Sequence, residues 1–126
     1  MLIWILLAIA VYYVGLFLPS LFLIPRIGLG QYLGSRDGDP EPGVYAGRAK
    51  RAHRNYKENL APFLALGVLA MIVPDIDMAM ALLGAKVFVF ARLAFLPLYI
   101  MAVPLVRSAA WTAGLVGMAM MAFALL

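Results

Sequence analysis

Long apolar stretches alternate with short polar segments along the chain. Residues 1–25 contain no charged side chain, and about 20 apolar residues are enough for one helical crossing of a bilayer. Three further apolar stretches follow, and the first of them continues a helical pattern that begins at Arg48. The pattern therefore predicts one domain of four membrane-spanning helices, at about residues 1–25, 48–73, 78–99 and 104–126.

The segments between these stretches have the composition of turns. Residues 26–47 contain six glycines together with Pro40 and Pro42, which favours turns over a helix and predicts the longest loop of the chain. Residues 74–77 predict a short turn. Pro104 is suited to the first turn of a helix, because its missing N–H would have no helical partner there.

The composition agrees with a membrane protein. Hydrophobic residues make up 66% of the chain and charged residues 13%, whereas soluble domains are about 45–50% apolar. The formal charge of +4 does not indicate a nucleic-acid partner, because most basic residues lie beside a predicted helix. The chain has no cysteine, so any thiol chemistry must use a thiol that the substrate brings.

The basic residues also predict an orientation. Lysine and arginine collect on the cytoplasmic side of membrane proteins, and the turn after the second predicted helix carries only Asp75 and Asp77. We therefore expect an integral protein of the inner or plasma membrane with both termini outside the cytoplasm. Seven basic residues lie in or beside the first loop: Arg26, Arg36, Arg48, Lys50, Arg51, Arg54 and Lys57.

The second predicted helix carries two polar groups. At 100° per residue one group shares a stripe about 80° wide: Arg48, Arg51, Asn55 and Glu58. Basic residues that only set the orientation in the membrane would not need the amide of Asn55 or the carboxylate of Glu58 beside them. Ionisable groups in a membrane helix instead indicate a functional site. The other group points elsewhere, where long basic side chains would reach headgroups or solvent: Lys50, His53, Arg54 and Lys57.

Further cations lie in the third and fourth predicted helices. Arg92 interrupts an apolar run and needs a partner, water or an anionic ligand. The purely structural alternative to a ligand is a salt bridge between Arg92 and Glu58. Tyr99 follows Arg92 by seven residues on the same face. Arg107 and Ser108 lie at the start of the fourth helix. Taken alone, Arg107 is as consistent with a charge that sets the membrane orientation as with a functional residue. Together with Arg51, the two arginines predict a cationic pocket that holds carboxylates and stabilises a thiolate.

These residues resemble a known family. The segment from Arg48 to Asn59, followed by Phe90-Ala91-Arg92-Leu93 and Tyr99, is similar to the membrane-associated proteins in eicosanoid and glutathione metabolism (MAPEG), with the character of a bacterial-type microsomal glutathione transferase. The most specific part is the Arg-Ala-His-x-Asn-x-x-Glu segment from Arg51 to Glu58, and the resemblance covers nearly the whole chain.

The resemblance implies a homotrimer with glutathione, the co-substrate, bound between subunits near the cytoplasmic face. It implies glutathione contacts for Arg51, Asn55, Glu58, Arg92 and Tyr99, and we add Arg48 because it shares their stripe. Glutathione offers two carboxylates to arginines and one ammonium to a glutamate, which agrees with these residue types. In the family pattern Arg107 matches the arginine that activates the thiol, and Ser108 matches a neighbouring serine.

The sequence also departs from the family pattern. The spacing from Tyr99 to Arg107 differs by one residue from some eicosanoid enzymes, Phe95 replaces a tyrosine or histidine, and Trp111 stands where one branch has a tyrosine. These departures leave open the thiol-activating residue and the substrate.

Three classes of function were compared. The leading hypothesis is a glutathione transferase or glutathione-dependent peroxidase acting on lipophilic electrophiles or hydroperoxides. The alternative is a non-catalytic lipid-binding or scaffold protein, which the family also contains. A small multidrug transporter is disfavoured, because the first predicted helix has no acidic residue.

Metal binding is also disfavoured. The alternating acids Asp37, Asp39 and Glu41 lack the rest of a calcium loop, and His53 has no second histidine. A polar or capping role for His53 is expected instead. Small residues at three- and four-residue spacing in the fourth helix predict close approach of a neighbouring helix: Ala110, Ala113, Gly114 and Gly117. Because four short helices enclose little volume, a ligand site between protomers is expected.

Overall fold

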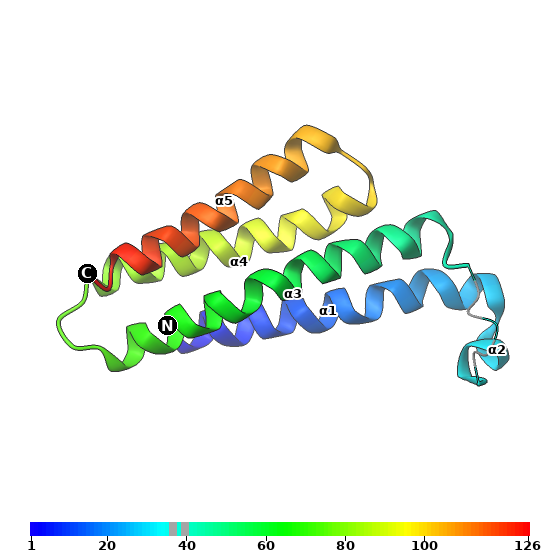
Figure 1. The fold of residues 1–126 in the computed structure, drawn as a ribbon, viewed down its shortest axis with the longest axis horizontal. Helices are drawn as coiled ribbons and strands as arrows, with labels where there is room; N and C mark the ends of the chain where they lie inside the picture. Colours follow the sequence, from blue (N-terminus) through cyan, green and yellow to red (C-terminus); the bar gives the residue numbers. More distant parts are fainter. Residues whose placement is uncertain (36–37, 39–40) are drawn as a thin grey trace.

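The computed structural model describes residues 1–35, 38 and 41–126 and is all-helical in these residues. Four long helices and one short helix follow each other along the chain (Figure 1). Their bounds are α1 Leu2–Ile27, α2 Leu29–Leu33, α3 Gly43–Ile72, α4 Met78–Ile100 and α5 Pro104–Phe123. The predictions for Arg36, Asp37 and Asp39 lie outside the described residues.

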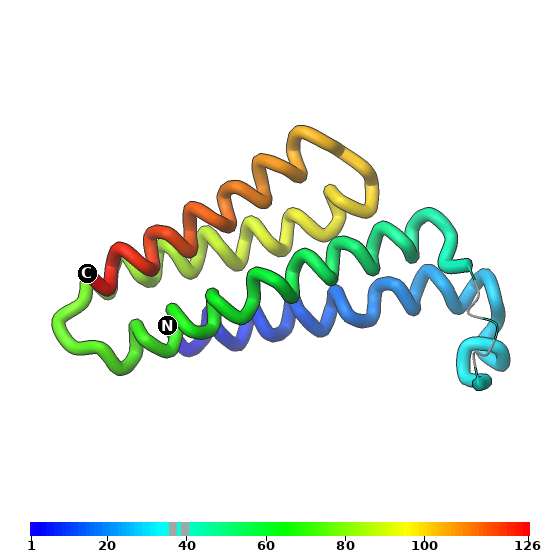
Figure 2. Tube along the Cα trace, in the orientation of Figure 1, coloured from blue at the N-terminus to red at the C-terminus, as the bar shows by residue number. Residues whose placement is uncertain are grey.

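The four long helices run side by side along one axis, with alternating directions along the chain (Figure 2). The two termini and the turn between α3 and α4 lie at one end of the bundle. The opposite end, called the basic end below, holds the last turn of α1, the start of α3 and the connection from α4 to α5. It therefore brings Arg26, Arg48 and Arg107 to the same end of the molecule.

The prediction of a loop without helix from residue 26 to 47 is wrong. Helix α1 continues through Pro25 to Ile27, α2 occupies Leu29–Leu33, and α3 begins at Gly43. Gly28 separates the first two helices with a φ of 78°, a conformation that glycine adopts without steric cost. The residues after it contain no proline until position 40, so a short helix forms, and the hydroxyls of Ser20 and Tyr32 join it to α1 at 2.8 Å.

Among the residues that the structure describes, three helices are long and apolar enough to cross a membrane: α1, α4 and α5. Helix α3 spans 30 residues but carries its charges in the first half, so its apolar second half alone is shorter than a bilayer crossing. Many large apolar side chains are exposed along the bundle, among them Leu6, Phe17, Leu83 and Phe90. This surface is suited to lipid rather than water, and four crossings remain a prediction.

Helices α4 and α5 pack with their backbones in close approach, as the small residues predict. A Cβ added to Gly117 would lie 2.6 Å from the carbonyl oxygen of Gly84, and one added to Gly84 would lie 2.5 Å from that of Gly117. A Cβ at Gly114 would lie 3.1 Å from Nε of Arg92. The glycines thus let α5 lie directly on α4 and over its buried arginine.

The core joins the two helix pairs. The rings of Phe63 in α3 and Phe88 in α4 stack with centroids 4.2 Å apart, and both side chains are fully buried. The hydroxyl of Tyr56 donates a hydrogen bond of 2.8 Å to the carbonyl oxygen of Ala8 in α1. These contacts fix α3 between α1 and α4, and Asn55 of α3 is turned toward Arg92 of α4.

Candidate functional site

A cavity of about 460 Å³ lies among α3, α4 and α5, and its lining includes residues near the end of α4 and the start of α5. Its volume lies in the range of small-molecule sites, about 300–1,000 Å³. Its lining residues are Asn55, Phe95, Tyr99, Arg107, Ser108, Trp111 and Thr112. The structure thus places four of the predicted site residues, from three different helices, around one space.

Behind the cavity, Arg92 is fully buried in α4. Its Nη1 donates a hydrogen bond of 3.1 Å to Oδ1 of Asn55, and its guanidinium carbon lies 5.4 Å and 5.7 Å from the ring centroids of Phe88 and Phe95. Nε and Nη2 are buried without a hydrogen-bond partner among the described residues. The positive charge of Arg92 therefore has no anion near it within the described chain.

The alternative interpretation of Arg92 as a salt bridge to Glu58 does not hold in the described chain. Glu58 is exposed on α3, whereas Arg92 is bonded to Asn55, which lies about one helical turn earlier. The amide oxygen of Asn55 thus takes the place expected for the carboxylate. Because Asn55 also lines the cavity, it connects the buried cation to the space where a ligand would lie.

Arg107 lines the cavity from the first turn of α5. Its guanidinium carbon is 4.8 Å from the centroid of the Tyr99 ring, which is within the distance of a cation–π interaction. The hydroxyl of Ser108 donates a hydrogen bond of 3.0 Å to the carbonyl oxygen of Pro104. The cavity thus has one half-buried cation, a phenol and a hydroxyl gathered on one side.

The remaining predicted residues lie outside this cavity. Arg48 is half-buried and donates a hydrogen bond of 3.1 Å to the carbonyl oxygen of Ile100, at the last turn of α4. Arg51 and Glu58 are exposed on the surface of α3. The predicted stripe is therefore divided in the single chain: one end supports the end of α4, Asn55 faces the cavity, and two charged groups face outward.

The prediction that His53 points to headgroups or solvent, or caps a helix, is wrong. The side chain is 9% exposed, in the interior of α3, and its ring lies 4.9 Å from that of Tyr12. A Cβ at Gly15 would lie 3.0 Å from His53 Nδ1. The glycine leaves room for the imidazole against α1, and both ring nitrogens are without a hydrogen-bond partner among the described residues.

A second hollow of about 380 Å³ lies on the outer face of α3. Its lining residues are Pro42, Gly47, Lys50, Arg51, His53, Arg54 and Lys57. Arg51 therefore borders the same hollow as Lys50, Arg54 and Lys57, although the sequence predicts that Arg51 lies on a different face from these residues. The reason is that a side chain of this length bends along the helix surface, so the direction of its Cβ does not decide which space it borders.

Sequence reasoning missed Thr112 as a site residue. Its hydroxyl donates a hydrogen bond of 3.0 Å to the carbonyl oxygen of Ser108, and it lines the cavity one helical turn after that serine. The signal was the spacing of four residues, which places Ser108 and Thr112 on one face of a helix. No cluster of potential metal ligands occurs within residues 1–35, 38 and 41–126.

The fold and the site define a class of protein: a helical membrane protein with a polar cavity beside a buried arginine. Comparison with known families matches residues 1–126 to the MAPEG family, and the chain belongs to that family. The family includes glutathione transferases, peroxidases and related proteins. The corresponding comparisons with curated proteins and with solved structures give no match.

Proposed function

We propose that the chain is a glutathione transferase or glutathione-dependent peroxidase of the bacterial microsomal type. The observation that carries this proposal is the cavity that gathers Asn55, Tyr99, Arg107 and Ser108 in front of buried Arg92. Family membership makes glutathione the expected co-substrate. The lipid-facing surface of the bundle agrees with a lipophilic second substrate.

Glutathione binding follows from the charges of the site. The tripeptide has two carboxylates, and a guanidinium is the donor that best matches a carboxylate. Arg92 is buried with two unused polar nitrogens, so an anion in the adjoining cavity lowers the cost of its burial. Asn55, bonded to Arg92 through Oδ1, keeps its amide Nδ2 group for the ligand.

Thiol activation is assigned to Arg107. A cation beside the sulfur favours the thiolate and lowers the pKa of the glutathione thiol. The ring of Tyr99 holds the guanidinium at 4.8 Å from its centroid, which orients Arg107 at the cavity, and the Ser108 hydroxyl is a neighbouring hydrogen-bonding group. The lipophilic substrate arrives through the bilayer. The thiolate sulfur then bonds to the electrophilic carbon and displaces its leaving group, which is chloride for a chlorinated nitrobenzene. With a hydroperoxide, the thiolate attacks the terminal oxygen, the alcohol leaves, and a second glutathione converts the resulting sulfenic acid to glutathione disulfide and water.

A homotrimer completes the site in this proposal. Arg51 and Glu58 are exposed in the single chain, and exposed charges on a membrane helix need a partner, water or a ligand. A neighbouring subunit packed on this face of α3 would enclose them. Arg51 would then contact a glutathione carboxylate, and Glu58 its ammonium group, from the edge of a site shared by two subunits.

The scaffold alternative is supported by a different observation. Arg107 is the one cation that lines the cavity within the described chain, and Arg48 is engaged with the end of α4. If no neighbour completes the site, one lining arginine is a weak receptor for two carboxylates. The chain would then be a non-catalytic lipid-binding membrane protein of the same family.

The experiment that tests the assignment of Arg107 follows the thiolate absorbance of bound glutathione against pH. Arg107→Ala should raise the pH at which the bound thiol ionises and lower the conjugation rate with a chlorinated nitrobenzene, while affinity changes little. Arg107→Lys should retain part of the effect. An unchanged titration removes Arg107 from the mechanism, and loss of binding alone makes it a carboxylate ligand.

A further inference from the structure

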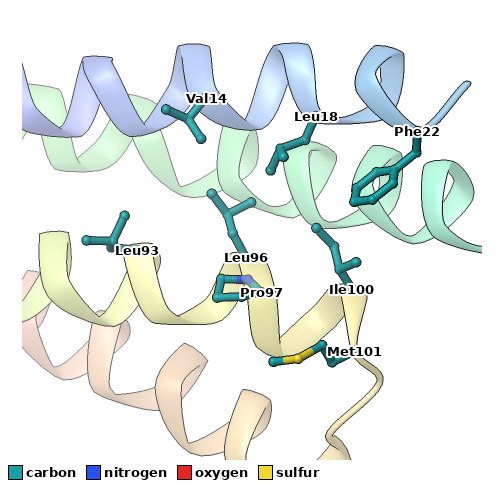
Figure 3. A pocket seen from close by; sticks show the side chains of 8 residues that line it. All are labelled: Val14, Leu18, Phe22, Leu93, Leu96, Pro97, Ile100 and Met101. Atoms are coloured by element: carbon teal, nitrogen blue, oxygen red, sulfur yellow. The ribbon is translucent and has the colours of Figure 1, made fainter. Parts of the chain in front are cut away.

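An apolar groove of about 450 Å³ lies on the surface between α1 and α4. Figure 3 shows Val14, Leu18 and Phe22 of α1 facing Leu96 and Ile100 of α4 across it. Every lining residue is apolar, and this space is separate from the polar cavity. The groove is open, because Val14 is 52% exposed.

The groove has the length of one leaflet. On α4 its lining runs from Leu93 to Met101, which is about 12 Å at 1.5 Å per residue. The hydrocarbon core of a bilayer is about 30 Å thick, so one leaflet contributes about 15 Å. Met101 directly follows the last residue of α4, so the groove extends from the basic end of the bundle toward its middle.

Two arginines lie at the outer end of this groove. Arg26 follows Phe22 by four residues and therefore lies on the same face of α1, and its guanidinium occupies the space that a side chain at Gly43 would fill. On the other side, Arg48 is bonded to the carbonyl oxygen of Ile100, a lining residue. The groove thus has an apolar body and a cationic mouth.

An aromatic ring connects Arg48 to the groove. The ring of Tyr45 lies 5.9 Å from that of Phe22 and 6.0 Å from the guanidinium carbon of Arg48, and it is 56% exposed. Tyrosine is enriched at the level of lipid headgroups because one end of its ring is apolar and the other polar. Tyr45 therefore marks the depth at which the headgroup region begins.

We propose that this groove holds one acyl chain of an anionic phospholipid whose phosphate lies against Arg26 and Arg48. The apolar lining accepts the chain, its length matches one leaflet, and the two cations are complementary to a phosphate. Juxtamembrane basic residues attract anionic lipids in this way. The proposal goes beyond the glutathione site, because it uses a different face of the bundle and does not require glutathione.

The test is native mass spectrometry of the full-length chain with equal amounts of phosphatidylglycerol and phosphatidylcholine that carry identical acyl chains. The wild type should retain phosphatidylglycerol in preference. Arg26→Gln should reduce that preference by about fivefold, the effect of one basic residue at an anionic surface. Val14→Trp fills the groove and should reduce retention of both lipids at least tenfold.

Two matched variants serve as controls. Lys86→Gln removes an exposed cation of α4 that lies beside Trp4 rather than the groove, and Ile3→Trp adds a ring at an exposed position of α1 outside the groove. Both should behave like the wild type. Equal loss in Lys86→Gln and Arg26→Gln would show general charge attraction and overturn the headgroup site.

The variants also distinguish the lipid proposal from an alternative in which another protein chain occupies the groove. They further distinguish it from the proposed glutathione function. If Val14→Trp leaves lipid retention unchanged, the acyl-chain site is wrong. If it changes the number of chains in the assembly instead, the groove is a protein interface and the lipid proposal is also wrong. Glutathione affinity, measured on the same samples, should be equal in Val14→Trp and in the wild type, so the two proposals fail independently.

Discussion

Arg92 of α4 donates a hydrogen bond of 3.1 Å to Asn55 of α3, and through it a fully buried cation reaches the wall of the cavity. A buried guanidinium with one protein acceptor is costly, because its remaining donors have left water without replacement. In the proposed function, a ligand in the adjoining cavity would supply the missing acceptors. The Arg92–Asn55 pair therefore supports the proposal that the cavity binds an anionic ligand.

Replacing Arg92 separates ligand binding from structural support. Arg92→Met keeps much of the apolar bulk and removes the charge, so thermal stability should stay equal or rise. Glutathione affinity should fall by about 1.5–3 kcal/mol, the range for hydrogen bonds to charged groups. Calorimetry and a thermal unfolding curve of each protein check both effects. A variant that melts earlier but binds glutathione normally would make Arg92 a structural residue.

The exposed charges of α3 should act through a shared site. Arg51→Ala and Glu58→Ala should each weaken glutathione affinity by about 1.5–3 kcal/mol, because the proposed function has both residues contact the ligand from the subunit edge. Lys57→Ala, an exposed charge on the same helix, is the control and should change affinity little. Equal losses in the three variants would mean that α3 contributes only general positive and negative charge.

The assembly should contain three chains. Native mass spectrometry in detergent measures this directly, and the expected mass is that of a homotrimer. The physical reason is that Arg51 and Glu58 remain uncovered in one chain, although the proposed function has both residues contact glutathione. A stable monomer that binds glutathione with full affinity would exclude a site between subunits.

The contact between α4 and α5 should tolerate no added carbon. Gly117→Ala places a Cβ 2.6 Å from the carbonyl oxygen of Gly84, so the helices must separate, at a cost of about 1–3 kcal/mol. Gly30→Ala, whose Cβ meets nothing within 4 Å, should leave stability equal or slightly higher. The measurement is the midpoint of thermal unfolding of both variants. Equal midpoints for Gly117→Ala and Gly30→Ala would contradict the close packing of α4 and α5.

The helices could be predicted from sequence because apolar length and charge are local properties. Residues 78–99 and 104–126 were predicted as helices, and α4 and α5 occupy nearly the same residues. The loop was predicted less well. Glycine density suggested turns throughout residues 26–47, but one positive φ at Gly28 is enough to end a helix and begin another.

The candidate site could be predicted only as far as residue type and family pattern allowed. Asn55 and Arg107 were expected in it, and the structure places them at one cavity. The bond from Arg92 to Asn55 rather than Glu58 depends on the rotation of α3 against α4, which periodicity does not determine. The burial of His53 depends on Gly15 of another helix, so a helical wheel of one segment could not show it.

The central claim is that this cavity binds glutathione. Isothermal titration calorimetry of glutathione into the purified chain measures this most directly, with Asn55→Leu as the companion variant, because Asn55 joins the cavity to Arg92. We expect saturable binding to the wild type and at least tenfold weaker binding to the variant. A folded wild-type protein that shows no binding would exclude a glutathione site and leave the lipid-binding scaffold as the function.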